Sequence, residues 1–465
     1  MDFSLILQMI LVALLMTTIY LVIGIIPGTD ETAVLVPMTL ILLALNLNPL
    51  VIIAGFFASF ITMNIADSLP AAITSIPGGV MATALVPHSQ VLKKKGLTTY
   101  GLRWMMFGSL IGLISSIVVS FAVWGIFRFI SAQTGLNLNN FIQQYTGYIF
   151  LAGAIFMSFT GKKKVVALLS IIPFGLLTAL LRNPASLTQI NPHVLNSLFG
   201  ELLFRSQLSM TPFFLSITTG PLLFGLFSLL VPSVFKTQKV DEKMTVLLSN
   251  DNRKLEHSHK KIVRKTAITS ALGSLLFFLS PVGVTVMLSE FSVRDETDEL
   301  EKALVSSAVI DGLASASYLS GILISLFVFA FPISPAALGP GKVIFDDPGL
   351  FIKDANLLFS SGQLLVPITI GVIIGAALSI TVGLTLGRKM TKFVFKYISQ
   401  ETVLIFLFSV IAMLSFAEAG FSGVLIIVAV GLVSGFLNKK GVGYGVQFMS
   451  LYAGNLFLSV LLSLM

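Results

Sequence analysis

Long apolar runs separated by short polar stretches dominate this sequence. The main runs are Ser4–Ile26, Trp104–Phe127, Ala267–Leu288, Leu364–Leu386, Leu404–Phe416 and Val442–Leu464. A helix rises about 1.5 Å per residue, so roughly 20 apolar residues cross a hydrocarbon core about 30 Å thick. Most of the runs reach that length, and Leu404–Phe416 belongs to a longer apolar stretch. The pattern predicts an all-α polytopic membrane protein.

Proline interrupts the apolar pattern at two pairs of matched positions. Pro27 and Pro281 are 254 residues apart (281 − 27), and Pro77 and Pro332 are 255 apart (332 − 77). Proline breaks a helix, and in lipid the freed backbone groups need partners from protein or from a water-filled cavity. Matched breaks in two halves of a chain are typical of transporter substrate sites. The alternative is simple proline kinks, which are common in membrane helices.

The elements around these breaks are short. Ala33–Leu45 is too brief to span the bilayer as a helix. Leu69–Pro87 and Leu319–Leu338 are each divided by their prolines, and this pattern predicts two re-entrant hairpins whose tips stop within the membrane.

The breaks and a charged stretch divide the chain into two structurally related halves with discontinuous helices. Residues 1–234 form the first half, residues 235–265 a charged cytoplasmic linker, and residues 266–465 the second half. A small-residue pair also recurs, as Gly108-xxx-Gly112 and Gly371-xxx-Gly375. We expect about eleven to twelve membrane segments in total.

Composition supports the membrane assignment. Charged residues make up 11% of the chain and hydrophobic residues 55%, whereas a soluble domain is about 25% charged. The net charge of +8 is concentrated in clusters between the apolar runs. Placing every cluster on the cytoplasmic side gives a consistent multi-pass topology in the cell membrane, so the basic residues indicate orientation and not a nucleic-acid partner.

The broken elements supply candidate substrate-binding residues. Hydroxyls, helix N-terminal amides and glycine backbone at such breaks suit a small anionic solute. The candidates are Pro27, Gly28, Thr29, Ser68, Thr74, Ser75, Pro77, Gly78, Gly79, Ser280, Gly283, Ser320, Pro332 and Ser334. The alternative is that these small residues only pack helices together.

Three carboxylates are candidates for ion coupling: Asp30, Asp67 and Asp311. Carboxylates inside a membrane are costly and commonly serve as proton or cation sites. Asp30 equally suits the first turn of a short helix, where it complements the helix dipole. Asp67 and Asp311 each precede a predicted hairpin, and the alternative is that both lie at the membrane interface.

Other chemistry finds no support in the sequence. There is no cysteine, and the four histidines show no metal-ligand pattern; His257 and His259 fall in the charged linker, where we expect them to be solvated. No phosphate-binding loop and no hydrolase constellation is present. We therefore expect a protein that is not an enzyme and has no cofactor or metal.

Several motifs, in order, resemble one family. Gly24–Leu40 followed by Asn48-Pro49-Leu50 is similar to its opening "G-x-x-PG…LLPLTFG-x-DP" run, and Leu85–Gly96 to its "LDGYPMAKKG". Ser280–Gly283 and Phe331–Ser334 resemble its "LPGxG" and "GIPGS". The family is the large membrane subunit of the tripartite tricarboxylate transporters, the TctA-type permeases. The resemblance implies a small membrane subunit and an extracytoplasmic solute-binding protein as partners.

The chain departs from the family pattern near the expected ligand. Asn64–Asp67 stands where the family has "YGG", Ser75 replaces the asparagine of the first tip, and Leu313–Ser315 replaces the paired asparagines of the second half. Citrate-like specificity therefore does not follow from the resemblance.

Three functions fit these observations. The first is a secondary transporter, a permease for a small organic anion such as a carboxylate, coupled to H⁺ or Na⁺. The second is a translocase for a lipid-linked phosphate such as a polyprenyl phosphate, which would also use amides at broken helices. The third is a membrane scaffold without transport, against which the paired interruptions argue.

Overall fold

The computed structural model describes most of the chain. The described residues are 2–26, 31–74, 81–135, 144–160, 163–183, 257–275, 298–329, 364–397 and 400–464, with single positions between 212 and 224, between 285 and 296, and at 337. Every regular element among them is a helix. The chain divides into two compact units, the first comprising Met1–Leu136, Val240–Phe277 and Pro281–Gln400, and the second comprising Asn137–Lys239, Phe278–Ser280 and Glu401–Met465.

The first unit contains most of the helices. They are α1 (Phe3–Ile23), α2 (Glu31–Ala44), α3 (Pro49–Ala66), α4 (Ser68–Thr74), η1 (Met81–Leu85), α5 (Val86–Lys94), α6 (Thr98–Thr134), α13 (His257–Gly273), α15 (Glu299–Ile324), η3 (Ser325–Phe329), α19 (Leu365–Thr385) and α20 (Gly387–Tyr397).

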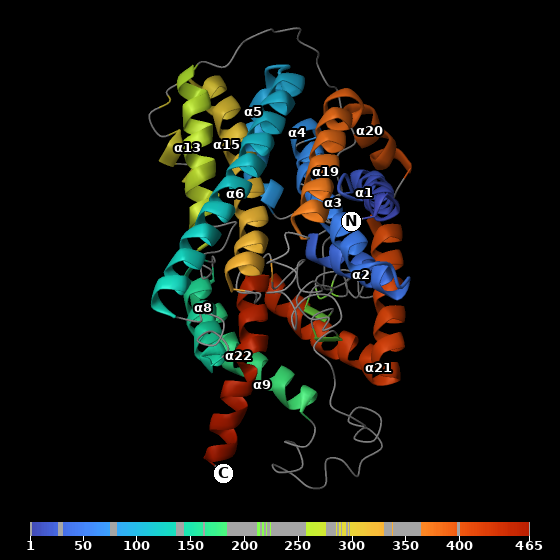
Figure 1. Cartoon of the computed structure of the whole chain (residues 1–465), viewed down its shortest axis with the longest axis vertical. Coiled ribbons are helices and arrows are strands. Elements are labelled where there is room, and N and C mark those ends of the chain that lie inside the picture. Colours follow the sequence, from blue (N-terminus) through green and yellow to red (C-terminus); the bar gives the residue numbers. More distant parts are fainter. Residues whose placement is uncertain are drawn as a thin grey trace. The chain divides into compact units, whose positions relative to one another are not determined.

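Two helices form the centre of the first unit. In the most apolar 18-residue stretch of α15, 94% of the residues are buried, and in that of α3–α4, 89% are buried. The corresponding share is 33% in both α1 and α19. Helix α3 packs against α1 and α19, and α15 packs against α13 and α6 (Figure 1). The outer helices present exposed apolar side chains such as Leu11 and Ile114, as expected for surfaces that face lipid.

Glycines bring the helices of the first unit into close contact. A Cβ at Gly108 or Gly112 of α6 would overlap the carbonyl oxygen of Ala308 or Gly312 of α15. Small residues at such positions allow membrane helices to approach backbone to backbone.

The α3–α19 pair repeats the α6–α15 contact. A Cβ at Gly371 would lie 2.5 Å from the carbonyl oxygen of Ala54, and one at Gly375 would lie 2.8 Å from that of Ala58. These glycines are 263 residues beyond Gly108 and Gly112 (371 − 108), and their partners Ala54 and Ala58 precede Ala308 and Gly312 by 254 (308 − 54).

A hydrogen bond recurs at the same two separations. Ser116 of α6 donates to the carbonyl oxygen of Ala316 at 2.9 Å, and Ser379 of α19 donates to the hydroxyl of Thr62 at 3.1 Å. Helix α6 of the first predicted half thus packs against α15 of the second, and α19 of the second predicted half packs against α3 of the first.

Both central helices begin at a side-chain cap. The Asn48 side chain accepts a hydrogen bond from the backbone amide of Leu50, and Pro49 occupies the first turn of α3. The Asp298 side chain accepts from the amide of Leu300 at 2.9 Å at the start of α15. Such caps satisfy amides that have no partner within the helix, so these two starts are encoded locally.

The second unit contains α8 (Thr146–Thr160), α9 (Lys164–Arg182), α21 (Gln400–Lys439) and α22 (Tyr444–Ser463). Helix α22 packs against α8 and α9, and a Cβ at Gly454 would lie 2.5 Å from the carbonyl oxygen of Gly175. Helix α21 is kinked at Gly420, whose φ of 62° lies in a region that favours glycine. Ser434 donates to Gln447 at 2.5 Å, which joins α21 to α22.

The described residues include eight helices long and apolar enough to cross a membrane. The prediction of an all-α polytopic membrane protein is therefore confirmed. Two details were wrong. Residues 257–265 of the predicted linker belong to α13, because this stretch of the sequence has no helix-breaking residue. Leu319 does not begin an element, because α15 runs through it from Glu299 to Ile324. Leu69 is the second residue of α4, and the predicted hairpin tips at Pro77 and Pro332 lie outside the described residues.

Candidate functional site

A buried carboxylate lies in the interior of α15. Asp311 is midway along this helix and 1% exposed. The Ser68 hydroxyl of α4 donates to Asp311 Oδ1 at 2.5 Å, and the Ser109 hydroxyl of α6 donates to Oδ2. The carboxylate therefore joins three helices that are far apart in the sequence.

A second carboxylate lies next to it. Asp67 occupies the turn between α3 and α4, is 2% exposed, and has its Oδ1 atom 3.4 Å from the Ser68 hydroxyl. A hydroxyl has one hydrogen to donate. Since Ser68 donates at the shorter distance to Asp311, that proton cannot fully satisfy both acids.

Two further polar side chains complete the cluster. Ser315, one turn after Asp311 on α15, donates to Asn64 Oδ1 at 2.8 Å, and its hydroxyl lies 3.3 Å from that of Ser109. Within the described part of the chain, Asn64 Nδ2 is buried without a hydrogen-bond partner. We call Asn64, Asp67, Ser68, Ser109, Asp311 and Ser315 the carboxylate cluster.

The electrostatics of the carboxylate cluster are unfavourable for two ionised acids. Among the described residues, the hydrogen-bond partners of Asp311 are serine hydroxyls, with no Lys, Arg or His among them. Placing an ionised carboxylate at the centre of a membrane helix costs about 3 kcal/mol, even on the scale that gives the lowest penalty. Repulsion between two ionised carboxylates adds to this cost. A bound proton or a small cation would remove both penalties.

Asp67 and Asp311 are both enclosed by neighbouring helices. Asp67 caps the C-terminal end of α3, whereas Asp311 lies midway along α15, and they are 2% and 1% exposed. Their role in ion coupling stays a prediction.

The other described candidates lie outside the carboxylate cluster. The Ser320 hydroxyl pairs at 2.6 Å with that of Ser274, which directly follows α13, as expected for a helix-packing residue. The Thr74 hydroxyl donates to the carbonyl oxygen of Pro70 in its own helix at 2.7 Å. The remaining candidates lie outside the described residues: Pro27, Gly28, Thr29, Asp30, Ser75, Pro77, Gly78, Gly79, Ser280, Gly283, Pro332 and Ser334.

Sequence reasoning missed one cation, Lys93, which contacts the end of α4. Lys93 of α5 donates through Nζ to the carbonyl oxygen of Thr74 at 3.4 Å and is partly buried. Thr74 is the last residue of α4, immediately before the candidate tip that begins at Ser75. The run of three lysines indicated only membrane orientation, because nothing local distinguishes Lys93 from Lys94 and Lys95.

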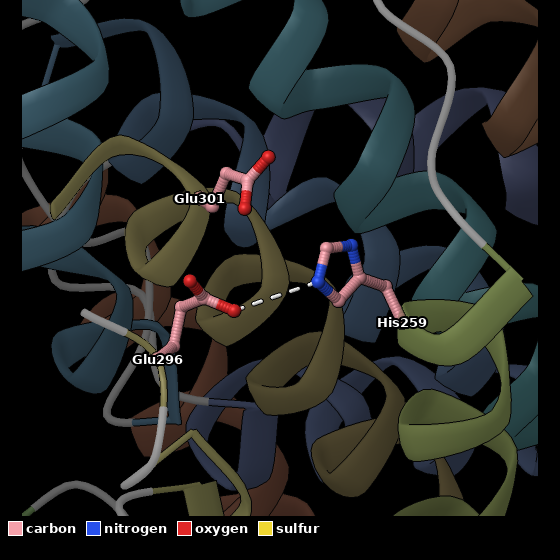
Figure 2. A group of neighbouring side chains, drawn as sticks. All are labelled: His259, Glu296 and Glu301. Carbon is pink, nitrogen blue, oxygen red and sulfur yellow. Dashed lines mark ion pairs between the residues drawn. The ribbon is translucent and has the colours of Figure 1, made fainter. Parts of the chain in front are cut away.

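A second polar group lies at the start of α15. His259 of α13 is 8% exposed, and its Nε2 atom is 3.5 Å from Glu296 Oε2. Glu301 lies on the same side of the imidazole ring (Figure 2). One ligand atom from each of the three residues lies within 4.8 Å of the others. The expectation of a solvated His259 was therefore wrong, because the charged stretch folds here as α13 and buries this side chain.

A comparison of the sequence with models of known protein families gives one match. The model of the tripartite tricarboxylate transporter TctA family matches residues 10–445, almost the entire chain. Neither the search of curated proteins nor the search of solved structures gave a match. The family match agrees with the membrane-length helices and with the resemblance in the sequence. This chain belongs to the tripartite tricarboxylate transporter TctA family, a family of membrane transporters and not of enzymes.

Proposed function

We propose that this chain is the solute-translocating subunit of a secondary transporter in the cell membrane, which moves a small organic anion, a carboxylate, with H⁺ or Na⁺. The observation that carries this proposal is the carboxylate cluster. It combines two enclosed acids, three hydroxyls and an amide where α3, α4, α6 and α15 meet.

The contact between α3 and α19, which is equivalent to that between α6 and α15, indicates that helix packing does not require this cluster. At the separations of 254 and 263 residues, Phe57 corresponds to Asp311 and Val372 to Ser109. Both of these counterparts are apolar and buried. The same backbone approach thus forms without a carboxylate, so the acid is better explained by binding an ion than by holding helices together.

The anionic nature of the solute is supported by Lys93. Its ammonium group lies at the end of α4, where it bonds the carbonyl oxygen of Thr74, and the candidate residue Ser75 follows next in the sequence. A fixed cation suits the binding of a carboxylate group. Solute and coupling ion would then bind at opposite ends of the short helix α4, since Ser68 begins it and Thr74 ends it.

The partners follow from the family. Its transporters are tripartite, so we propose that this chain works with a small membrane subunit and an extracytoplasmic solute-binding protein. Delivery of the solute by a binding protein would leave translocation and ion coupling to the large subunit.

Thermal unfolding of the purified chain tests the proposed function. Dicarboxylates, tricarboxylates, inorganic phosphate and a polyprenyl phosphate are each added with and without Na⁺, at two pH values. A ligand that binds the folded state raises Tm, and coupling makes that rise depend on the ion. We expect a carboxylate to give the largest ion-dependent rise. A response to the polyprenyl phosphate alone would replace this proposal with lipid-linked phosphate translocation, and no response to any ligand would favour a scaffold.

Replacing Lys93 is expected to weaken solute binding while leaving ion binding intact. Lys93→Ala removes a partly buried cation, which for a single charged contact corresponds to on the order of a tenfold loss of affinity for the carboxylate. Lys93→Arg should retain most of the affinity. The measurement is the same ligand-dependent rise in Tm, with Lys95→Ala as the control, because Lys95 is exposed in the same basic run. Equal affinities in Lys93→Ala and Lys95→Ala would remove Lys93 from the solute site.

A further inference from the structure

The group formed by His259, Glu296 and Glu301 has the composition of a transition-metal site. It contains one imidazole and two carboxylates, all supplied by the first unit. Imidazole nitrogen and carboxylate oxygen are ligands for Zn²⁺ and its neighbours in the first transition row, whereas Ca²⁺ and Mg²⁺ favour all-oxygen sites.

The distances suit such an ion. Two ligand atoms about 2.05 Å from a tetrahedral Zn²⁺ lie roughly 3.3 Å apart. His259 Nε2 and Glu296 Oε2 are 3.5 Å apart, and all three ligand atoms fall within 4.8 Å. A shift of the Glu301 carboxylate toward the other two ligand atoms would complete a three-residue site with an open fourth position.

An ion pair between His259 and Glu296 accounts for only part of the arrangement. In the described part of the chain the Glu301 carboxylate has no ion pair or hydrogen bond, although it faces the same imidazole (Figure 2). The helix dipole favours an acid in the first turn of α15, but the exposed Glu299 already supplies one. Two carboxylates beside one imidazole leave a net negative charge that a dication would neutralise.

An apolar shell backs the group. Val263, Val293 and Leu304 belong to one buried cluster and are at most 5% exposed. Such a shell limits water access and strengthens metal–ligand interactions. The chain has no cysteine, so no thiolate competes for the ion.

We propose that His259, Glu296 and Glu301 bind one transition-metal dication, best matched by Zn²⁺, and that the ion fastens α13 to the start of α15. Glu301 is on α15, Glu296 precedes it, and His259 is in the first turn of α13. The ion would thus stabilise the helix that also contains Asp311. This inference is independent of the proposed transport function.

Zinc titration of the purified full-length chain tests the proposal. The affinity tag is removed and bound metal is stripped with a chelator before Zn²⁺ is added. Bound metal is measured by elemental analysis, and unfolding is followed by tryptophan fluorescence, because Trp104 lies in the same apolar cluster as Val263. We expect one zinc ion per chain and a Tm that rises with zinc concentration. Glu301→Gln and His259→Ala should each weaken zinc binding by on the order of tenfold or more.

Matched variants separate a metal site from an ion pair. His257→Ala and Glu299→Gln change exposed residues of the same two helix ends and should bind zinc as the unmodified chain does. Glu296→His should lower the metal-free Tm, because it removes the ion pair, yet retain zinc binding, because imidazole is also a ligand. Should His259→Ala fail to fold, Glu301→Gln decides, since Glu301 takes no part in the ion pair. Unaltered zinc binding in Glu301→Gln, or no zinc bound by the unmodified chain, overturns the proposal.

Discussion

Replacing Asp311 by Asn is expected to abolish gradient-driven uptake while leaving the protein folded. The asparagine has nearly the same shape but cannot hold a proton or a cation by charge. Loss of a charged contact worth about 3 kcal/mol weakens ion binding roughly 100-fold. Folding should be preserved or improved, because Ser68 and Ser109 retain an amide partner and no acid is buried. The variant should therefore have an unaltered or higher Tm together with background uptake.

The measurement is carboxylate accumulation in proteoliposomes containing the transporter with its partner subunits, driven in turn by a Na⁺ gradient and by a pH gradient. Asp298→Asn is the matched control: it makes the same chemical change on the same helix, but Asp298 is exposed and only caps α15. Asparagine caps helices about as well as aspartate. Normal uptake by Asp311→Asn would exclude this carboxylate from ion coupling.

Replacing Gly108 by Ala is expected to give the largest loss of stability of any single methyl addition in α6. The new Cβ would overlap the carbonyl oxygen of Ala308, which is backbone and cannot rotate away. Separating two tightly packed helices in this way costs about 1–3 kcal/mol. Uptake should fall as well, because Ser109 would move away from Asp311.

Gly125→Ala provides the control for this stability measurement. Gly125 is on the same helix, and a Cβ there would meet nothing within 4 Å. Alanine in an open helical position is neutral or stabilising, by at most about 1 kcal/mol. Tm and the free energy of unfolding in detergent, measured side by side, check the difference. Equal stabilities of the two variants would mean that α6 and α15 do not approach as closely as described.

These glycine contacts recur at separations close to those of the matched prolines, although the division into two related halves stays a prediction. Three separate contacts recur with the same pair of separations, two formed by glycines and one by Ser116 or Ser379. Chance agreement at a single position would carry little weight, whereas a repeated unit would produce agreement at three positions one turn apart. The carboxylate cluster differs between the two contacts. Asp311 and Ser109 are polar at the α6–α15 contact, whereas their counterparts at the α3–α19 contact, Phe57 and Val372, are apolar.

The sequence alone determined the class of protein, the positions of helices α1, α6, α19 and α22, and the two central acids. Lipid requires each segment to satisfy its own backbone, so length, hydropathy and local caps such as Asn48 decide where helices form. The rarity of a carboxylate in an apolar run was enough to single out Asp67 and Asp311. The glycine pairs could be found because their spacing is local.

Only the tertiary structure decided which residues those acids meet. Ser109 bonds Asp311, whereas Ser307 bonds the carbonyl oxygen of Ala303 in its own helix, and both are serines in similar apolar surroundings. Lys93 and His259 also became candidates only because helix packing places Thr74 next to Lys93 and Glu296 next to His259. Local pattern cannot reveal such partners, because the contact depends on how two helices rotate and approach, and backbone proximity at the small residues sets that geometry.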